Sequence, residues 1–125
     1  MSRQSARTYR DLKVWKRGMG LVERVYRLTR SFPKSEKFGL SSQLRQAAVS
    51  VPSNIAEGWG RNATGAFVRF LRIAHGSLAE VETQLTIARW LGYVEERVHK
   101  ELLEKLTTER KMVLSFIRSL EQRSS

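Results

Sequence analysis

Apolar residues alternate at spacings of four and three through residues 67–88, and this pattern restricts the chain to helical packing. The series consists of Phe67, Leu71, Ala74, Leu78, Val81, Leu85 and Ala88. Because an α-helix turns once in about 3.6 residues, these side chains share one face, as in an antiparallel helical bundle or coiled coil. One such helix cannot bury its apolar face alone, so other helices of the chain must cover it.

Three further stretches show helical periodicity, and short breaks rich in Gly, Pro and Asn separate the four. The pattern predicts helices over about 11–32, 37–60, 65–91 and 95–121. Because the connections are short, neighbouring helices should be antiparallel. We therefore predict an all-α fold: an up-down-up-down four-helix bundle over residues 11–121, preceded by a flexible basic arm (1–10) and followed by a tail (122–125).

A proline stands in the middle of the second predicted helix. The apolar series on this helix, Leu40, Leu44, Ala48, Val51, Ile55 and Trp59, crosses Pro52 without a change of phase. An interior proline removes one hydrogen bond and usually kinks or ends a helix, at a cost of about 3 kcal/mol. Val51 would be a poor N-cap for a new helix beginning there. The sequence therefore predicts a single helix, kinked at Pro52.

The first predicted helix carries two apolar lines, about 110° apart around its axis. One line comprises Leu12, Trp15, Met19, Val22, Tyr26 and Thr29, and the other comprises Val14, Leu21, Val25, Leu28 and Phe32. One bundle needs a single apolar face, and monomers seldom expose a contiguous apolar patch of this length. We expect the first line to face the core and the second to form a homo-oligomer interface. The alternative is a wider internal core.

The chain is strongly basic, with 23 Lys and Arg against 12 Asp and Glu and a net charge of +11. Residues 1–37 contribute 11 bases and 3 acids, or +8 of that charge. Such a field attracts polyanions, namely RNA, DNA or an acidic lipid surface. The remaining sector of the first helix supplies the candidate nucleic-acid-binding residues: Arg10, Lys13, Lys16, Arg17, Arg24, Arg27 and Arg30. With no stacking platform or base-reading motif nearby, contacts to phosphates are expected rather than base readout; the alternative is a solvated surface.

A polar strip runs beside the apolar line of the second helix. We expect a structural polar network that fixes helix register or a subunit interface, made of Gln43, Arg45, Ser50, Asn54 and Glu57. In this interpretation Glu57 pairs with Arg45, Arg69 or Arg72. The alternative, an active site built on Glu57, lacks a nucleophile and base pair and a glycine-rich phosphate loop. We therefore predict a protein that is not an enzyme.

The composition also bears on cofactors and location. The chain has no cysteine and only two histidines, His75 and His99, and neither has a second ligand at i+4. We therefore expect no metal site and no cofactor. No run approaches about 18 apolar residues, and the N-terminus is polar and basic, so neither a membrane span nor a signal peptide is expected. A cytoplasmic location, with no membrane partner, is the corresponding prediction.

Several motifs together resemble a known family. They are Tyr9-x-x-Leu12-x-x-Trp15, Phe32-Pro33-x-x-Glu36-x-Phe38-Gly39-Leu40-x-x-Gln43-Leu44-Arg45, Ser50-Val51-Pro52-x-Asn54-Ile55-Ala56-Glu57-Gly58, Phe70-Leu71-x-x-Ala74-x-Gly76-Ser77-Leu78-x-Glu80 and Leu91-Gly92-Tyr93. Over roughly residues 9–120 the chain is similar to the four-helix bundle proteins named after the intervening sequences of bacterial 23S ribosomal RNA. The segment 43–58 is the most specific part of the match.

The resemblance carries its own expectations. It implies a ring-shaped homopentamer and a proline that does not end the second helix. It also implies distant similarity to the accessory protein of diversity-generating retroelements, which binds nucleic acid and a reverse transcriptase. It implies no enzymatic activity.

Two functions follow from the sequence. The first is a non-enzymatic, oligomeric, basic bundle that binds RNA or DNA by phosphate contacts, as an accessory to a nucleic-acid-processing partner protein. The alternative is a protein-interaction scaffold without affinity for nucleic acid, whose charge serves solubility or docking to an acidic protein.

Overall fold

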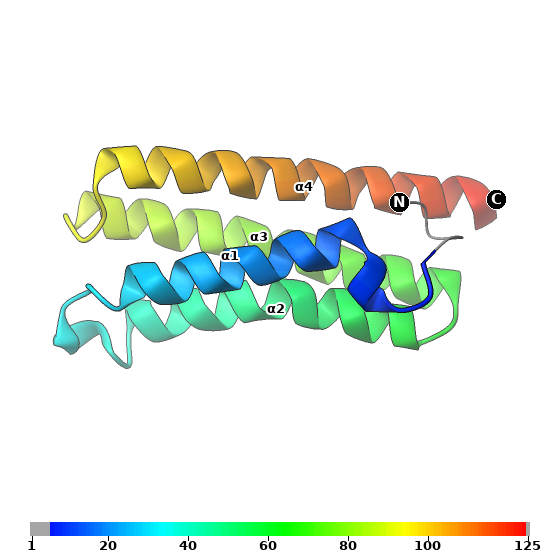
Figure 1. Ribbon diagram of the computed structural model, residues 1–125, viewed down its shortest axis with the longest axis horizontal. Helices are drawn as coiled ribbons and strands as arrows, with labels where there is room; N and C mark the ends of the chain where they lie inside the picture. The colour runs from blue at the N-terminus through cyan, green and yellow to red at the C-terminus, as the bar shows by residue number, and fades with distance from the viewer. Residues whose placement is uncertain (1–5, 125) are drawn as a thin grey trace.

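The computed structural model describes residues 6–124, and these form four long helices (Figure 1). The helices are α1 (Lys13–Thr29), α2 (Leu40–Gly60), α3 (Thr64–Trp90) and α4 (Glu96–Ser124), with short 3₁₀ turns η2 (Tyr9–Asp11) before α1 and η3 (Lys34–Glu36) before α2. Residues 6–124 contain no strand, so the predicted all-α, four-helix fold is confirmed. None of these helices is both long and apolar enough to cross a membrane.

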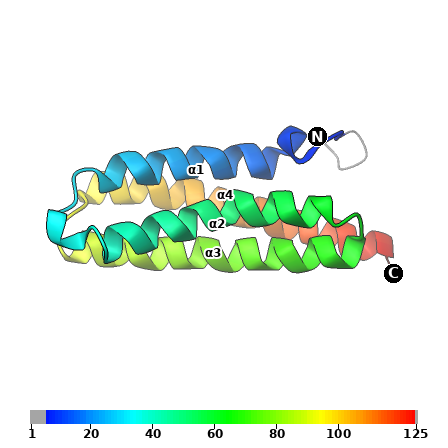
Figure 2. The same ribbon diagram turned by 90° about the horizontal axis from the view of Figure 1, so that it is seen from below.

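The four helices lie side by side along one axis. In Figure 1 the colour shows each helix running back along the one before it, so that the α1–α2 and α3–α4 connections meet at the same end. Figure 2 shows α1 and α3 on opposite sides of the bundle. α1 packs on α2 and α4, and α3 packs on the same two helices, but α1 and α4 approach each other less closely than the other neighbouring pairs.

The turn between α3 and α4 depends on a glycine. Gly92 has a φ of +81°, a conformation that residues with a Cβ rarely adopt. The N–H of Tyr93 donates to the carbonyl of Ala88 at 2.9 Å and that of Gly92 to the carbonyl of Arg89 at 3.0 Å. This pair of hydrogen bonds is the Schellman motif, which satisfies carbonyl groups that the helix end leaves free.

α2 continues through Pro52 to Gly60 as one helix, as the phase of its apolar residues predicts. The kink at this position stays a prediction. α1 lies against α2 here through Gly18, since a Cβ on Gly18 would stand 3.4 Å from Val51 Cγ1 and 3.5 Å from Pro52 Cβ. Gly18 therefore allows the close contact of the two helices beside the proline.

The second apolar line of α1 does not have the role predicted for it, and the first line faces the core only in part, through the buried Leu12 and Thr29. The expected oligomer interface is part of the chain's own core: Val14, Leu21, Val25 and Phe32 are buried, and Leu28 is half-buried and packs against them. In the line expected to face the core, Met19 is 45% exposed and Tyr26 38% exposed. The prediction was wrong because periodicity defines apolar faces but not how a helix is rotated between its two neighbours.

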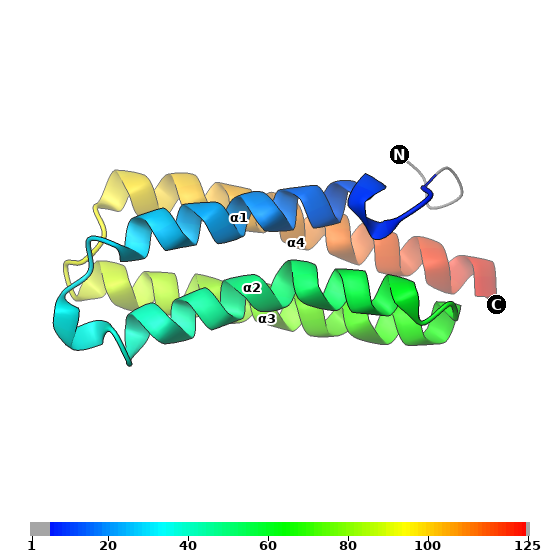
Figure 3. The ribbon, with the colours of Figure 1, turned by 60° about the horizontal axis from the view of Figure 1, so that its bottom comes forward.

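Residues 6–10 of the predicted flexible arm include a hydrogen-bonded turn before α1. The Thr8 hydroxyl accepts a hydrogen bond from the N–H of Arg10 at 3.0 Å, and the Asp11 carboxylate accepts one from that of Arg7 at 2.9 Å. The Tyr9 ring packs edge-on against Trp15 with the centroids 5.3 Å apart. Figure 3 shows this turn at the end of the bundle where α2 ends. Residues 1–5 of the predicted arm lie outside the described residues.

Candidate nucleic-acid interface

The seven predicted nucleic-acid-binding residues lie on α1, on the turn before it and at its C-terminal end. Lys13, Lys16 and Arg27 are exposed on α1, and Arg30 is exposed directly after the helix. Arg24 is partly exposed and Arg17 is 41% exposed, and both line the groove between α1 and α4. Arg10 belongs to the preceding turn, where its guanidinium lies 5.1 Å from the centroid of the Tyr9 ring. The structure thus divides the cations into two groups. We call the surface with Lys13, Lys16, Arg27 and Arg30 the outward face of α1, and Arg17 and Arg24 belong to the groove.

Acidic residues neutralise part of this set. On the outward face Arg27 pairs with Glu23. In the groove an Arg24 Nη atom lies 3.8 Å from a carboxylate oxygen of Glu101. Arg17 Nε lies 3.8 Å from Oε1 of the buried Glu109, whose raised pKa of about 8 keeps it from neutralising Arg17 at neutral pH. Ion pairs at exposed positions contribute little energy and are screened by salt.

Four cations of the set form no ion pair within residues 6–124, and all four are exposed: Arg10, Lys13, Lys16 and Arg30. Lys13, Lys16 and Arg30 give the outward side of α1 and its C-terminal end a positive charge that faces solvent.

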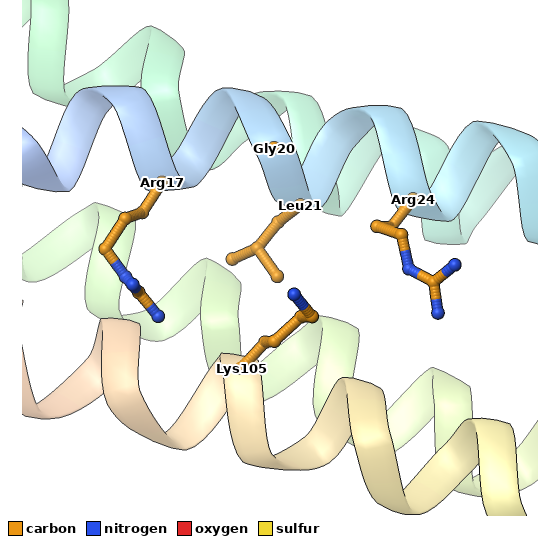
Figure 4. Close-up of a pocket in the computed structure, with 5 residues that line it drawn as sticks. All are labelled: Arg17, Gly20, Leu21, Arg24 and Lys105. Carbon is orange, nitrogen blue, oxygen red and sulfur yellow. The ribbon is translucent and has the colours of Figure 1, made fainter.

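The groove between α1 and α4 contains three adjoining pockets. One, of about 170 Å³, is lined by Arg17, Gly20, Leu21, Arg24 and Lys105 (Figure 4). The other two extend it along α4, and together the three are lined by five cationic side chains and two carboxylates, Glu101 and Glu104. Lys105 was not predicted as a site residue, because nothing in the sequence indicates that α4 packs beside α1 at this level.

A buried acid lies directly beneath the groove. Glu109 on α4 is fully buried, and within residues 6–124 neither of its carboxyl oxygens has a hydrogen-bond partner. Burial raises the pKa of Glu109 to about 8, although the nearby Arg17 acts in the opposite direction. The acid is therefore mainly protonated at neutral pH.

The sequence analysis missed this residue, although its signal was present. Leu102, Leu106, Glu109 and Val113 follow spacings of 4, 3 and 4, so Glu109 occupies a core position of the α4 apolar series.

The predicted polar network forms only in part. Asn54 Nδ2 donates to the Ser50 hydroxyl at 2.9 Å, and that hydroxyl lies 2.7 Å from the hydroxyl of Ser77 on α3, a partner that was not predicted. Gln43 is exposed and lies outside the network. The network therefore joins α2 to α3 through small hydroxyl and amide groups.

Two charged residues of the predicted network have other partners. Arg45 Nε donates to the Thr29 hydroxyl of α1 at 2.7 Å, and its guanidinium stacks on the ring of Tyr26. Glu57 is exposed and pairs with Arg61 one turn along its own helix at 2.8 Å. The predicted pairing of Glu57 with Arg45, Arg69 or Arg72 was wrong, because the exposed side chain pairs with Arg61 instead.

The two histidines lie between α3 and α4. Nε2 of His99 lies 3.2 Å from the Thr86 hydroxyl. Burial lowers the pKa of His75, and the charges of Arg110 and Arg72 lower it further. Within residues 6–124 no three His, Asp or Glu side chains come together in a group that could hold a metal ion.

Comparisons with known proteins agree with the fold. The sequence profile of the 23S rRNA-intervening sequence proteins matches residues 10–115. A crystal structure of a protein with unknown function from the S23 ribosomal protein family of Bacteroides thetaiotaomicron superposes with a TM-score of 0.78 at 22% identity, covering 84% of this chain and 95% of that one. Among curated proteins, none matches this chain. The profile match spans most of the bundle, and the chain belongs to the 23S rRNA-intervening sequence protein family.

Proposed function

We propose that this chain is a non-enzymatic, oligomeric, basic bundle that binds RNA or DNA through phosphate groups. The observation that carries the proposal is the outward face of α1, where Lys13, Lys16 and Arg30 are exposed without an ion pair in the described part of the chain. Side chains spaced along one helix face can neutralise successive phosphates and release the counterions that these hold. In this proposal the protein is an accessory to a partner that processes nucleic acid.

Contacts to phosphate, rather than to bases, suit the chemistry of this surface. Of the aromatic residues near it, Tyr9 packs against Trp15 and lies beside the Arg10 guanidinium, and Tyr26 is stacked by Arg45. Stacking on bases requires an unoccupied ring face. We therefore expect affinity to depend on the shape and charge of the nucleic acid, with little dependence on sequence.

The test is a fluorescence-anisotropy titration of nuclease-treated protein at several salt concentrations. Because the family is named after intervening sequences of 23S rRNA, a structured RNA hairpin is the first probe, with single-stranded RNA and duplex DNA beside it. The triple variant Lys13→Gln, Lys16→Gln, Arg30→Gln should reduce the slope of log K against log salt by about two to three. The matched control, Lys100→Gln, Lys111→Gln, Arg118→Gln on α4, removes the same charge and should bind almost as the wild type does.

Other outcomes would contradict the proposal. Equal losses in both triple variants would mean that net charge, and not the face of α1, governs binding. No binding of any probe at low salt would reject the proposal and favour the protein-interaction scaffold, for which the search would turn to acidic protein partners.

The oligomeric part of the proposal requires a different interface from the one predicted. An apolar stripe at spacings of 4, 3 and 4 remains accessible on α1: Trp15 and Val22 are half-buried, and Met19 and Tyr26 are exposed. We propose that a second copy of the chain covers this stripe; the number five rests on the family resemblance alone. Light scattering should show an oligomer that Met19→Asp weakens and Leu91→Asp does not. A monomeric wild type would contradict this part.

A further inference from the structure

Three cationic side chains line one pocket between α1 and α4. Arg17 and Arg24 extend from α1 toward α4, and Lys105 extends from α4 into the space between them, beside Leu21 (Figure 4). The pocket has a volume of about 170 Å³, and no carboxylate belongs to its lining. Cations from two helices, placed around an open space, form an arrangement that an anion can bridge.

One hydrogen-bond donor at this pocket is buried without an acceptor in the described part of the chain. Nε of Arg24 is buried, and within residues 6–124 it has no hydrogen-bond partner. The carboxylates nearest to Arg24 and Arg17 lie at 3.8 Å, whereas a charge-assisted hydrogen bond between a guanidinium and a carboxylate measures about 2.7–2.9 Å. A buried donor without an acceptor costs free energy, which a bound oxyanion would recover.

The acid beneath the pocket does not cancel its charge. Glu109 is the carboxyl group closest to Arg17, and desolvation keeps it mainly protonated at neutral pH. Glu109 therefore leaves the charge of Arg17 available to an anion in the pocket.

We propose that Arg17, Arg24 and Lys105 form a binding site for a single phosphate group. This inference rests on the proposed function, because the phosphate is one that the nucleic acid carries. Glu101 and Glu104 line the adjoining pockets and repel further phosphates along the groove, so the site accepts one group while the outward face of α1 holds its neighbours. The phosphate is either an internal diester or a terminal monoester, both of which present oxygen acceptors to guanidinium groups.

Inorganic phosphate provides a direct probe of the site. The Nε–H signals of Arg17 and Arg24 in ¹H–¹⁵N NMR spectra should shift saturably on addition of phosphate and not on addition of chloride at equal ionic strength. No shift of either signal at saturating phosphate would overturn the proposal.

Two glycines offer a matched pair of variants. Gly20 lines the pocket, and a Cβ there meets no atom within 4 Å, so Gly20→Glu adds a carboxylate to the lining at a position with room for a side chain to start. Gly76 on α3 is equally open, and Gly76→Glu changes the net charge by the same amount at a distance from the site. We expect Gly20→Glu to abolish the phosphate-induced shifts and to weaken RNA binding about tenfold, and Gly76→Glu to change neither by more than about twofold. Equal effects of the two variants would overturn the proposal.

The measurements separate failure of the site from failure of the function. If phosphate shifts the arginine signals but RNA does not bind, the anion site stands and the proposed function fails. If RNA binds, but phosphate shifts neither arginine signal and Gly20→Glu leaves RNA affinity unchanged, the proposed function stands and the proposed site is wrong. Once the site is supported, 5′-phosphorylated and 5′-hydroxyl oligonucleotides distinguish the two sources: tighter binding of the former assigns a terminal monoester, and equal binding assigns the backbone diester.

Discussion

The stability of this bundle depends on pH through Glu109, a buried acid of α4. Its carboxyl group is fully buried, and burial raises its pKa from 4.5 to about 8. Below pH 4.5 the group is protonated in both the folded and the unfolded chain and has no effect. As the pH rises from 4.5 to 8, the unfolded chain loses the proton and the folded chain keeps it, so the free energy of unfolding falls. Above about pH 8 both states are ionised and the loss is constant, at roughly 5 kcal/mol.

The variant Glu109→Gln tests this linkage because it retains the shape of the side chain without its titration. We expect the variant to gain stability over the wild type as the pH rises, by several kcal/mol between pH 5 and 8.5, in urea unfolding followed by circular dichroism. Glu104→Gln, at an exposed position of the same helix, is the control and should show a nearly constant difference. A constant difference for Glu109→Gln as well would mean that the acid is not buried in solution.

The sequence analysis assigned a buried role to Glu57 and overlooked Glu109. It did so because each acid was interpreted from its neighbours in the sequence and not from its position in the helical repeat. Glu57 occurs beside small and polar residues, which suggested a buried network, yet its side chain reaches solvent and pairs with Arg61. Glu109 stands in the apolar series of α4, where a charged residue is easily read as an interruption. A core position depends on phase and not on residue type, so the spacing of 4, 3 and 4 was the more reliable guide.

At the scale of elements, a cluster formed by Tyr93, Glu36 and Phe32, called the joint below, links the α1–α2 connection to the α3–α4 turn. The Tyr93 hydroxyl donates to Oε2 of Glu36 at 2.9 Å, and the other carboxylate oxygen of Glu36 accepts from the N–H of Leu40 at 3.1 Å. The ring of Tyr93 packs against Phe32 with the centroids 5.4 Å apart. These contacts connect the α1–α2 connection to the α3–α4 turn, and both lie at the same end of the bundle (Figure 1).

Tyr93→Phe removes the hydroxyl and keeps the ring, so it measures the hydrogen bond of this joint. Because the acceptor is a carboxylate but the site is partly exposed, we expect a loss of about 1 kcal/mol in the free energy of unfolding. Tyr26→Phe is the matched control, since no hydrogen bond of the Tyr26 hydroxyl occurs in the described residues, and it should change stability very little. Equal effects of the two variants in urea unfolding would show that the joint contributes no stability.

The four helices were predictable from the sequence, whereas the rotation of each helix about its own axis, which decides the face it buries, was not. Apolar phase located all four helices and carried α2 correctly through Pro52, because spacing alone determines which side chains share a face. The choice between the two apolar lines of α1 failed, since it depends on where α2 and α4 lie around that helix. Gly18 was a usable signal: it lies on the side of Val14, Leu21 and Val25, where a small residue permits close packing against α2.

At the scale of the whole molecule, the candidate phosphate site exists because the first and the last helix of the bundle pack side by side. Arg17 and Lys105 lie far apart in the sequence and meet only because α1 and α4 become neighbours along a loosely packed groove. The basic sector of α1 was predictable from its charge pattern, but the contribution of α4 was not, since periodicity within one helix carries no information on which residues face it from another.

The net charge of +11 predicts opposite effects of salt on the free and the bound protein. Self-repulsion destabilises the free chain, and its ion pairs are mostly exposed and weak, so moderate salt should raise the melting temperature of the free protein. RNA at about 100 times its Kd should stabilise the fold by about 2.7 kcal/mol at low salt. High salt weakens the complex. As salt is added, the melting temperature of the free protein should therefore rise, while the further increase in melting temperature caused by RNA should become smaller. Thermal unfolding with and without RNA, across a salt series, would reject phosphate binding if the increment were independent of salt.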